Sequence, residues 1–364
     1  MRTVLLGSGH IGQTIARLLA TAGDGRTGHH THDYSVTIAD RDAHALQAVS
    51  GLNIEKTVVD STDPQALAAL LRQADVVVNA LPYHMAVPVA TVARQTGTHY
   101  FDLTEDVQAT AAIAALATDA PTVFMPQCGL APGFIGIAAH HLAAGFDEVH
   151  DIKMRVGALP QFPTNELKYN LTWSVDGLIN EYCHPCAALR DGERVSVDAL
   201  ADLEHFSLDG VEYEAFNTSG GLGSLCETLA GKVRNLDYKS VRYPGHQQRM
   251  KFLLGDLGLR HDQALLKDIL RKSVPATMQD VVLVFVTVSG LRDGKLMQEV
   301  FTRKIFARQS DGRWQSAIQA STAAGVCAAL DLFREGRLPA RGFIRQEQIA
   351  LPDLLANRFG AVYA

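Results

Sequence analysis

Two spacings of hydrophobic residues alternate along the first 125 residues of the chain. Short apolar runs, typical of buried strands, occupy residues 3–6, 35–39, 56–59, 75–79, 99–102 and 122–125. Between these runs, apolar residues recur at helical spacing, which predicts a helix after Gly9 and further helices over residues 42–50, 63–73 and 85–96. Such regular alternation of strand and helix predicts an α/β fold with a doubly wound parallel sheet.

The pattern changes after Gly129. Longer strands are predicted over residues 151–159, 210–216, 279–291 and 301–307, with helices near residues 225–232 and 247–257. A turn at Arg292-Asp293-Gly294 would join the last two strands as an antiparallel pair. We therefore expect a first domain over residues 1–128 and a second, α+β domain with an open mixed or antiparallel sheet over residues 129–317. A helix over residues 322–337 is expected to bring the segment from about 318 to 364 back to the first domain.

Composition narrows the class of protein. The chain has 364 residues, of which 47% are hydrophobic and 20% charged, and its formal net charge is -6. This balance gives no electrostatic reason to expect nucleic acid or an anionic membrane as a partner. No apolar run approaches the roughly 18 residues that cross a bilayer. The apolar N-terminus runs into a glycine motif, so we interpret it as a buried strand and expect a cytoplasmic protein without a signal peptide.

The cysteine and histidine residues offer little evidence of a metal or redox site. Five scattered cysteines argue against a disulfide framework and favour a reducing compartment. Cys183 and Cys186 have the C-x-x-C spacing, but no second pair completes a zinc site. His29, His30 and His32 lie in a polar segment that is expected to be a solvated loop. We therefore expect no metal ion.

Gly7, Gly9 and Gly12 form a G-x-G-x-x-G motif between a buried strand and an apolar-faced helix. This context predicts a Rossmann dinucleotide-binding turn, with His10 and Ile11 inside it. Gly7 allows the tight turn, Gly9 lets the backbone approach the pyrophosphate, and Gly12 allows close packing of helix and strand. The helix N-terminus supplies N–H groups for the phosphates. The motif therefore predicts a nicotinamide dinucleotide cofactor.

Asp40 ends the second predicted strand, where a carboxylate accepts hydrogen bonds from the adenosine ribose and repels a 2′-phosphate. Asp40 therefore favours NAD, whereas the adjacent Arg41 leaves NADP open. Further cofactor contacts are expected at the carboxyl ends of the next two strands. Asp60 is expected near the adenine, and the nicotinamide half is expected near Ala80, Leu81 and Pro82.

Five stretches spread over most of the chain resemble one known family. They are VLLGSGHIGQTIARLL, VVVNALPYH, YFDLTED, CGLAPGF and KSVRYPGHQQRMKFL, and the segment LTWSVDGLINEYCHPCAALRDGE matches as well. The sequence resembles the saccharopine dehydrogenase superfamily, and within it most closely the lysine 6-dehydrogenase branch. This resemblance implies an NAD(P)-dependent amino acid dehydrogenase that acts on CH–NH2 or CH–NH donors. The alternatives are a saccharopine- or opine-type reductase that uses NADPH and a non-catalytic NAD(P)-binding sensor.

Such chemistry needs a group that handles the proton of the amine and a group that anchors a carboxylate. Asp102 ends the fifth predicted strand and resembles the acidic position near the reacting amine, although a simple turn aspartate remains an equal alternative. Cys128 precedes the Gly129-Leu130-Ala131-Pro132-Gly133 turn and is either a proton relay or a pocket lining. Arg242 is suited to a bidentate carboxylate contact, and His246 to proton exchange near neutral pH.

The remaining candidate residues are expected to line the substrate pocket. The expected substrate is a small amino acid. Tyr169, Trp173 and Thr218 would suit the pocket wall, although Trp173 suits a hydrophobic core equally well. The glycines of segment 217–222 suggest a mobile loop that closes over the substrate. Ser219 and the glycines after it stand where related enzymes often carry an acidic residue followed by glycine, which puts lysine itself in doubt as the substrate. A homodimer is the default expectation.

Overall fold

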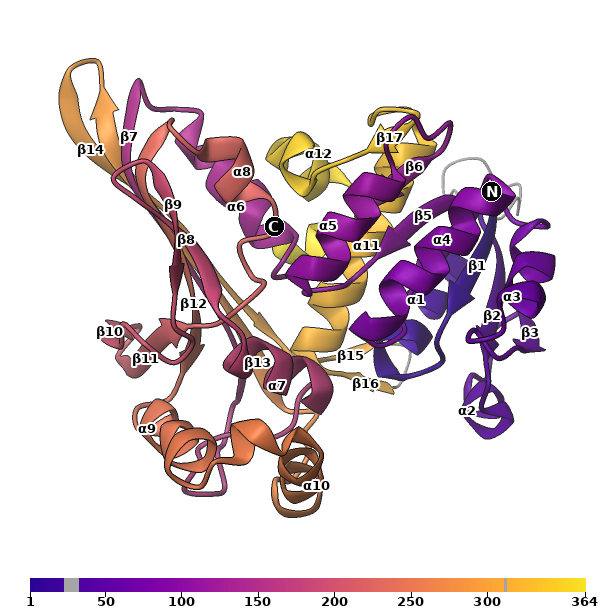
Figure 1. Cartoon of the computed structure of the whole chain (residues 1–364), viewed down its shortest axis with the longest axis horizontal. Coiled ribbons are helices and arrows are strands. Elements are labelled where there is room, and N and C mark those ends of the chain that lie inside the picture. The colour runs from indigo at the N-terminus through magenta and orange to yellow at the C-terminus, as the bar shows by residue number, and fades with distance from the viewer. Residues whose placement is uncertain (23–32, 311–312) are drawn as a thin grey trace. The chain divides into compact units, whose positions relative to one another are not determined.

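The computed structural model describes residues 1–22, 33–310 and 313–364. Two compact units divide the chain (Figure 1). One unit comprises Met1–Leu130 and Thr322–Ala364, and the other comprises Ala131–Ser321. The three histidines of the predicted polar loop lie outside the described residues. Within the described part, no helix is both long enough and apolar enough to cross a membrane.

The first unit is built on a seven-stranded sheet whose order is β17-β6-β5-β4-β1-β2-β3. All neighbours in this sheet pair in parallel. The strands are β1 (Arg2–Leu6), β2 (Ser35–Asp40), β3 (Glu55–Val58), β4 (Val76–Asn79), β5 (His99–Asp102), β6 (Val123–Met125) and β17 (Gly342–Phe343). The order reverses direction at β1, so the sheet is doubly wound, as the alternating pattern predicts.

Helices connect these strands and bury their apolar stripes. They are α1 (His10–Thr21), α2 (Ala43–Ala48), α3 (Pro64–Leu71), α4 (Ala86–Thr96) and α5 (Val107–Leu116). Aspartates cap three of them, because Asp42, Asp63 and Asp106 each accept hydrogen bonds from backbone N–H groups of the first turn. The core of this unit includes Leu71, Val77 and other buried apolar side chains of the sheet and helices.

The C-terminal segment completes the first unit. Helix α11 (Ala317–Arg334) crosses the boundary between the units, and β17 adds the last strand of the sheet beside β6. The segment continues with α12 (Leu351–Ala356) and ends in a 3-10 turn, Gly360–Tyr363. Asp331 on α11 is buried and accepts hydrogen bonds from the Tyr34 hydroxyl at 2.6 Å and from Arg358. Residues almost 300 positions apart are thereby joined.

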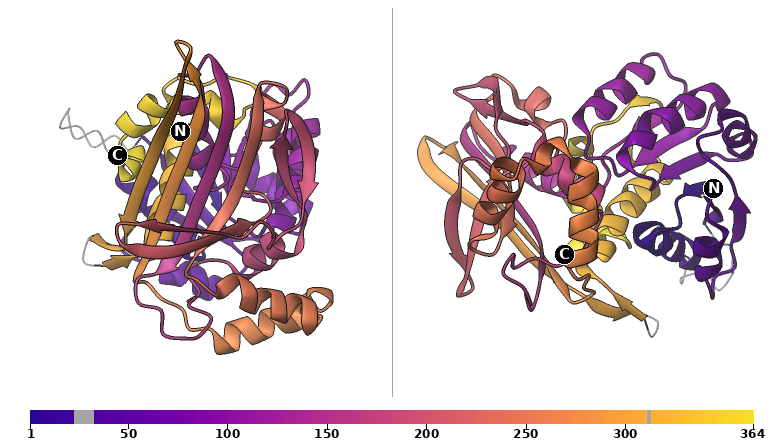
Figure 2. Two further views of the ribbon diagram at one scale, coloured as in Figure 1. Left: turned by 90° about the vertical axis from the view of Figure 1, so that its left-hand side faces the viewer. Right: turned by 60° about the horizontal axis from the view of Figure 1, so that its bottom comes forward.

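The second unit is built on an eight-stranded mixed sheet. Its main order is β10-β11-β12-β7-β13-β14, and the hairpin β8–β9 pairs with β12. The strands are β7 (Glu148–Pro160), β8 (Cys186–Arg190), β9 (Glu193–Val197), β10 (Glu204–Leu208), β11 (Val211–Asn217), β12 (Val233–Arg242), β13 (Asp280–Arg292) and β14 (Lys295–Phe306). Figure 2 (left) shows the orange β13 and β14 beside the magenta β7. Among the described strands of this sheet, β12 and β7 pair in parallel and all other neighbours pair antiparallel. The predicted α/β fold class and the antiparallel pair around the Asp293 turn are therefore confirmed.

Helices of the second unit include one at the start and several after the long strands. They are α6 (Phe134–Ala143), α7 (Val175–Cys183), α8 (Leu225–Leu229), α9 (His246–Lys251) and α10 (Gln263–Ser273). One wide turn of π-helix, Phe252–Asp256, continues α9. A hydrophobic cluster that includes Tyr182, Phe216 and Leu254 joins α7 and α9 to the sheet. A small hairpin, β15 (Arg308–Ser310) with β16 (Arg313–Gln315), and short 3-10 turns complete the described secondary structure.

Candidate cofactor and substrate sites

The glycine turn between β1 and α1 has the geometry that a bound pyrophosphate needs. Gly7 has φ of +100°, and a Cβ atom there would lie 2.9 Å from the carbonyl oxygen of Ala80. A Cβ atom at Gly12 would lie 2.0 Å from the Gly7 oxygen, so helix and strand pack too closely for a side chain. At Gly9 a Cβ atom would meet no atom of the described residues within 4 Å. The backbone is therefore open at the one glycine that is expected to face the phosphates.

The N-terminus of α1 begins immediately after this turn. No side chain of the described residues caps it, and its first turn holds no acidic residue. Gly9 and His10 are exposed, and Ile11 is half-buried. A twelve-residue helix whose first N–H groups lack a capping side chain offers donors and a positive dipole end to an anion. The described residues thus fit the pyrophosphate of a dinucleotide.

Asp40 lies at the end of β2, as predicted, and it also organises the glycine turn. Its Oδ2 atom accepts hydrogen bonds from the Ser8 backbone N–H at 2.7 Å and from the Ser8 hydroxyl at 2.8 Å. Its Oδ1 atom accepts from the Asp42 N–H at 3.0 Å. Burial raises the pKa of Asp40, but the hydrogen bonds from Asp42 and Ser8 outweigh it, and the pKa lies below its ordinary value. Asp40 is therefore a carboxylate at neutral pH.

The other predicted cofactor residues lie at the carboxyl ends of their strands. Arg41 and Asp60 are both exposed, after β2 and β3 respectively. The Ala80-Leu81-Pro82 segment follows β4 and is partly exposed, and the Leu81 N–H donates to the Asn79 Oδ1 atom at 3.2 Å. Because β4 and β1 are neighbours in the sheet, this segment lies next to the Gly7 turn.

Asp102 is buried, with 1% of its surface exposed. Its Oδ2 atom accepts a hydrogen bond from the Tyr100 hydroxyl at 2.6 Å, and its Oδ1 atom accepts from the N–H groups of Thr104 and Gln127. Burial raises the pKa of Asp102 to about 6 even though these hydrogen bonds lower it. The hydrogen bond from the Thr104 N–H is the contact expected of a turn aspartate, which was the alternative role for Asp102. The carboxyl group is also able to change protonation near neutral pH, which a proton-handling role needs.

Cys128 lies next to Asp102 in the same unit. It is buried, and its Sγ atom donates to the Met125 carbonyl oxygen at 3.1 Å. Burial, together with the Asp102 charge, raises the pKa of the Cys128 thiol well above its ordinary value. Because this thiol remains protonated, Cys128 is better suited to lining a pocket than to relaying a proton.

Arg242 ends β12 in the second unit and is almost fully buried. Its guanidinium carbon lies 5.1 Å from the Tyr169 ring centroid and 5.9 Å from that of Tyr182. Within the described part of the chain, no carboxylate lies within ion-pair distance of this group, although the charge of the buried Glu181 acts on it. The buried Nε atom of Arg242 has no hydrogen-bond partner among the described residues. A permanently charged group in an aromatic surrounding, with an unused donor, suits an anionic ligand group.

His246 is the first residue of α9 and has no exposed surface. Its ring stacks on Phe216, and its Nε2 atom lies 3.1 Å from the Tyr182 hydroxyl. Burial, reinforced by the Arg242 charge, lowers the pKa of His246 to about 3. The imidazole is therefore neutral at physiological pH. This burial does not favour the proton exchange near neutral pH that the residue type suggested.

The remaining predicted wall residues divide between pocket and core. Tyr169 is buried beside Arg242, and Thr218 lies 2.8 Å, Oγ1 to Oγ, from Ser240 on β12. Trp173 packs against the hydrophobic cluster of α7 and α9 and is thus a core residue in this structure. A Cβ atom at Gly221 would lie 2.2 Å from the Tyr238 ring. Close packing therefore explains this glycine, and the expectation of a mobile loop over residues 217–222 stays a prediction.

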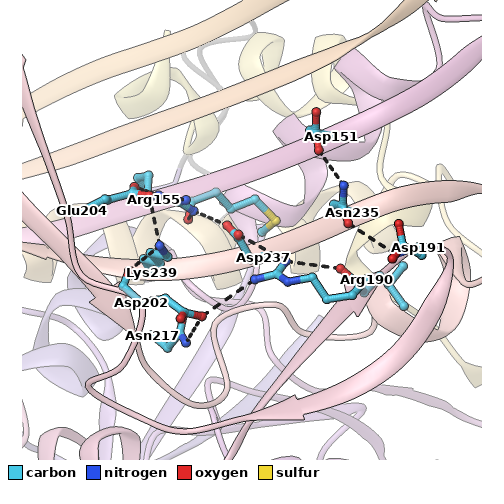
Figure 3. Close-up of polar contacts among 12 residues, drawn as sticks. Asp151, Arg155, Arg190, Asp191, Asp202, Glu204, Asn217, Asn235, Asp237 and Lys239 are labelled. Carbon is cyan, nitrogen blue, oxygen red and sulfur yellow. Dashed lines mark hydrogen bonds and ion pairs between the residues drawn. The ribbon is translucent and has the colours of Figure 1, made fainter.

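The opposite face of β12 carries a network of charged side chains, drawn in Figure 3. Arg155 on β7 contacts Glu204 and lies 2.5 Å from Asp237, while Lys239 lies 3.0 Å from Glu204. Side chains alternate along a strand, so Asp237 and Lys239 lie on one face of β12, and Tyr238 and Arg242 on the other. This largely buried network fixes the strand that positions Arg242.

Comparison with known families assigns both units. A model described as the saccharopine dehydrogenase NADP binding domain matches residues 3–125, and a model described as the saccharopine dehydrogenase C-terminal domain matches residues 129–360. The chain belongs to the saccharopine dehydrogenase family. This result confirms the superfamily that the sequence resembles, and it leaves the lysine 6-dehydrogenase branch a prediction.

Relatives of this saccharopine dehydrogenase family member agree with the assignment. The saccharopine dehydrogenase [NADP(+), L-glutamate-forming] of Saccharomyces cerevisiae is 28% identical over 279 residues, which are 72% of this chain and 59% of that protein. The solved structure of apo saccharopine dehydrogenase (L-Glu forming) from the same yeast has a TM-score of 0.79 at 18% identity and covers 97% of this chain and 96% of its own. The structure of homospermidine synthase from Legionella pneumophila, in complex with NAD, has a TM-score of 0.66 at 12% identity. The match covers 100% of this chain and 89% of that chain. These two structures share the fold.

Several residues of this family member's candidate sites were missed by sequence reasoning. Ser8 orders the glycine turn, Tyr100 contacts Asp102, and Tyr182 contacts both Arg242 and His246. Ser8 and Tyr182 have partners that are distant in sequence, whereas Tyr100 contacts an aspartate two residues further along the same strand. No group of three or more histidine, cysteine, aspartate or glutamate residues in the described ranges is placed to hold a metal ion.

Proposed function

We propose that this protein is an NAD(P)-dependent oxidoreductase that acts on a C–N bond of an amino acid. The observation that carries the proposal is the buried Arg242 guanidinium, which has an unpartnered Nε atom and no ion pair in the described residues. Such a group suits the carboxylate of an amino acid. Family membership and the glycine turn support the cofactor.

The chemistry consists of one hydride and one proton. The bound nicotinamide supplies hydride acceptance from the carbon that carries the nitrogen, and it supplies the reverse transfer in reduction. The ammonium nitrogen first loses a proton and becomes an amine. Loss of the hydride from the adjacent carbon then forms an imine, which water hydrolyses. In this proposal Arg242 anchors the carboxylate and Asp102 holds or accepts the proton. The pKa of Asp102, raised to about 6 by burial, supports that assignment.

Cofactor preference follows from Asp40 in this proposal. Its carboxylate lies at the end of β2, where it would repel a 2′-phosphate. We therefore propose NAD as the cofactor. The matching family description names NADP, and the yeast relative's name includes NADP(+), so both cofactors belong in any test.

Two substrate classes are candidates. The resemblance to lysine 6-dehydrogenase favours oxidative deamination of a primary amine on lysine or a close relative. The yeast relative favours a secondary amine that releases glutamate, as its name states. Ser219 followed by Gly220, where related enzymes often have an acidic residue and a glycine, weakens the case for lysine itself.

A spectrophotometric screen tests the proposal. The purified protein is mixed with NAD or NADP and with lysine, ornithine, saccharopine or related diamino acids, and formation of the reduced cofactor is followed. The reverse direction is tested with the reduced cofactor, glutamate and a semialdehyde. We expect turnover with at least one amine, and a marked loss of that turnover in Arg242→Met. Absence of turnover with every amine in both directions would overturn the proposal.

A further inference from the structure

A buried chain of hydrogen bonds links three segments at the carboxyl edge of the first unit's sheet. It starts at Asp102, whose Oδ2 atom accepts from the Tyr100 hydroxyl at 2.6 Å. The Asn79 Nδ2 atom donates to the same hydroxyl oxygen at 3.3 Å, and the Asn79 Oδ1 atom accepts from the Leu81 N–H at 3.2 Å. At the other end, Asp102 accepts from the Gln127 N–H. The chain therefore joins the Leu81 segment to the segment that contains Cys128.

The Tyr100 hydroxyl group faces one acceptor more than it can serve. It has a single proton, and both the Asp102 Oδ2 atom and the Ala86 carbonyl oxygen, at 3.1 Å, lie within reach. When Asp102 is ionised, the proton goes to the shorter contact with the carboxylate. When Asp102 carries a proton on Oδ2, it donates to Tyr100, and Tyr100 then donates to Ala86. The network thus has two arrangements, which differ by one proton.

We propose that Tyr100 is a positioning residue that orients the Asp102 carboxyl group and couples its proton to the Leu81 segment through Asn79. The inference rests on the proposed function in one respect, because it assumes that the nicotinamide half of the cofactor binds at the Leu81 segment. It assigns a role to Tyr100 and Asn79, two residues that the proposed function does not use. Its consequence is that the cofactor affinity and the protonation of Asp102 depend on each other.

The surroundings of Asp102 make this proton accessible near neutral pH. Burial raises the pKa of Asp102 to about 6, and the Tyr100 hydroxyl lowers it through the hydrogen bond to the charged form. Tyr100 and Cys128 are the titratable side chains of the described residues that interact with Asp102, and burial raises the pKa of each. Neither changes charge between pH 5 and 8, so a titration of this cluster in that range belongs to Asp102.

The sign of the pH dependence follows from the raised pKa. The folded protein binds the Asp102 proton more tightly than the unfolded chain, whose aspartates titrate near 3.8. The stabilisation from this proton is therefore full below about pH 4 and is lost as the pH rises through about 6. The difference in thermal midpoint between the wild type and Asp102→Asn, measured without cofactor from pH 4 to 8, reports this step.

The decisive variant is Tyr100→Phe, which removes only the hydroxyl group. The ionised carboxylate loses a hydrogen bond, so we expect the step to move to higher pH by roughly one to two units. Tyr34→Phe is the matched control, because Tyr34 also donates to a buried aspartate, Asp331, in the same unit. General destabilisation would affect both variants, but only Tyr100→Phe is expected to move the step.

The coupling to the cofactor is tested by a separate titration. The dissociation constant of the reduced cofactor, followed by its fluorescence, is expected to change across the same pH step in the wild type. In Asn79→Ser the step in stability is expected to remain while the pH dependence of cofactor affinity is lost. A step at the same pH in Tyr100→Phe and the wild type, or a cofactor affinity that is constant across the step, would overturn the inference. These measurements need no substrate, so a failed activity screen with an intact step counts against the proposed function alone.

Discussion

The hydroxyl group of Tyr182 lies 3.1 Å from the Nε2 atom of His246, and the Leu167 carbonyl oxygen lies 2.9 Å from the Nδ1 atom of the same ring. A carbonyl oxygen only accepts, so Nδ1 carries the proton and Nε2 accepts from Tyr182. Both ring nitrogens are thus occupied within the protein. His246 orders Tyr182, and Tyr182 in turn lies beside the Arg242 guanidinium.

The first prediction concerns the charge of His246. Its pKa is lowered to about 3 by burial and the Arg242 charge, so we expect a neutral ring with an unprotonated Nε2 atom from pH 5 to 8. The unfolded chain binds this proton near pH 6.5, so the contribution of His246 to stability is full above that pH and falls as the pH drops toward 3. Nitrogen NMR shifts of the ring measure its state directly. A titration midpoint between pH 6 and 7 would contradict the prediction.

The second prediction separates binding from stability at Arg242. Arg242→Met keeps most of the side-chain volume and removes a buried charge that has no ion pair in the described residues. We expect the free energy of unfolding to fall, because the substitution leaves the buried Glu181 carboxylate without the positive charge that acts on it. The KM for a carboxylate substrate is expected to rise roughly 10- to 150-fold, the effect of a lost charge-assisted bond of about 1.5–3 kcal/mol. Thermal melting and steady-state kinetics check the two effects, and an unchanged KM would remove Arg242 from the site.

The third prediction contrasts two glycines of the same turn. Gly9→Ala fits its backbone, which has φ of −67°, and meets open space, so folding is expected to be unaffected. The methyl group would occupy the approach of the pyrophosphate, and we expect cofactor affinity to fall by more than roughly tenfold, about 1.4 kcal/mol. Gly12→Ala would instead force the Gly7 oxygen away and destabilise the fold by roughly 1–3 kcal/mol. Melting curves and cofactor titrations distinguish the two, and equal effects on stability would refute the contrast.

The fourth prediction concerns Asp40. Asp40→Ala leaves the buried Ser8 N–H without its acceptor, which costs roughly 1–3 kcal/mol of stability. It also removes the charge that would repel a 2′-phosphate, so the affinity for NAD is expected to fall more than that for NADP. Asp42→Ala is the control, because Asp42 caps α2 two residues away. The ratio of the two dissociation constants should change in Asp40→Ala alone, and a constant ratio would mean that Asp40 does not select the cofactor.

The regular half of the fold was predictable because most of its central strands, such as β1 and β4, are buried on both faces. Runs such as residues 75–79 end within a residue of the observed strands, and local sequence contains the whole signal. Helix α5 was missed because its alanine-rich sequence shows no clear stripe. Strand β12 was missed because Asp237 and Lys239 interrupt its apolar pattern. Their compensating partners, Arg155 and Glu204, are distant in sequence.

Some residues of the candidate sites were likewise predictable from local sequence, and others were not. Gly7, Gly9 and Asp40 follow from motif spacing, since the chemistry of the turn is local. The aromatic surroundings of Arg242 depend on contacts between residues at least 60 positions apart, and no pattern in the sequence pairs Tyr182 with Arg242. Burial decides the protonation of His246 and Asp102, and burial is a property of the folded chain.

The C-terminal segment determines the order in which the two units are completed during synthesis. When residue 130 leaves the ribosome, six of the seven strands of the first sheet exist, but β17 and the Asp331 partner of Tyr34 do not. The second unit is continuous over Ala131–Ser321 and has all of its strands before that segment appears. The nascent first unit therefore keeps the β6 edge of its sheet unpaired until β17 has been synthesised. A premature stop codon between residues 322 and 342 would leave the second unit whole and the first unit incomplete.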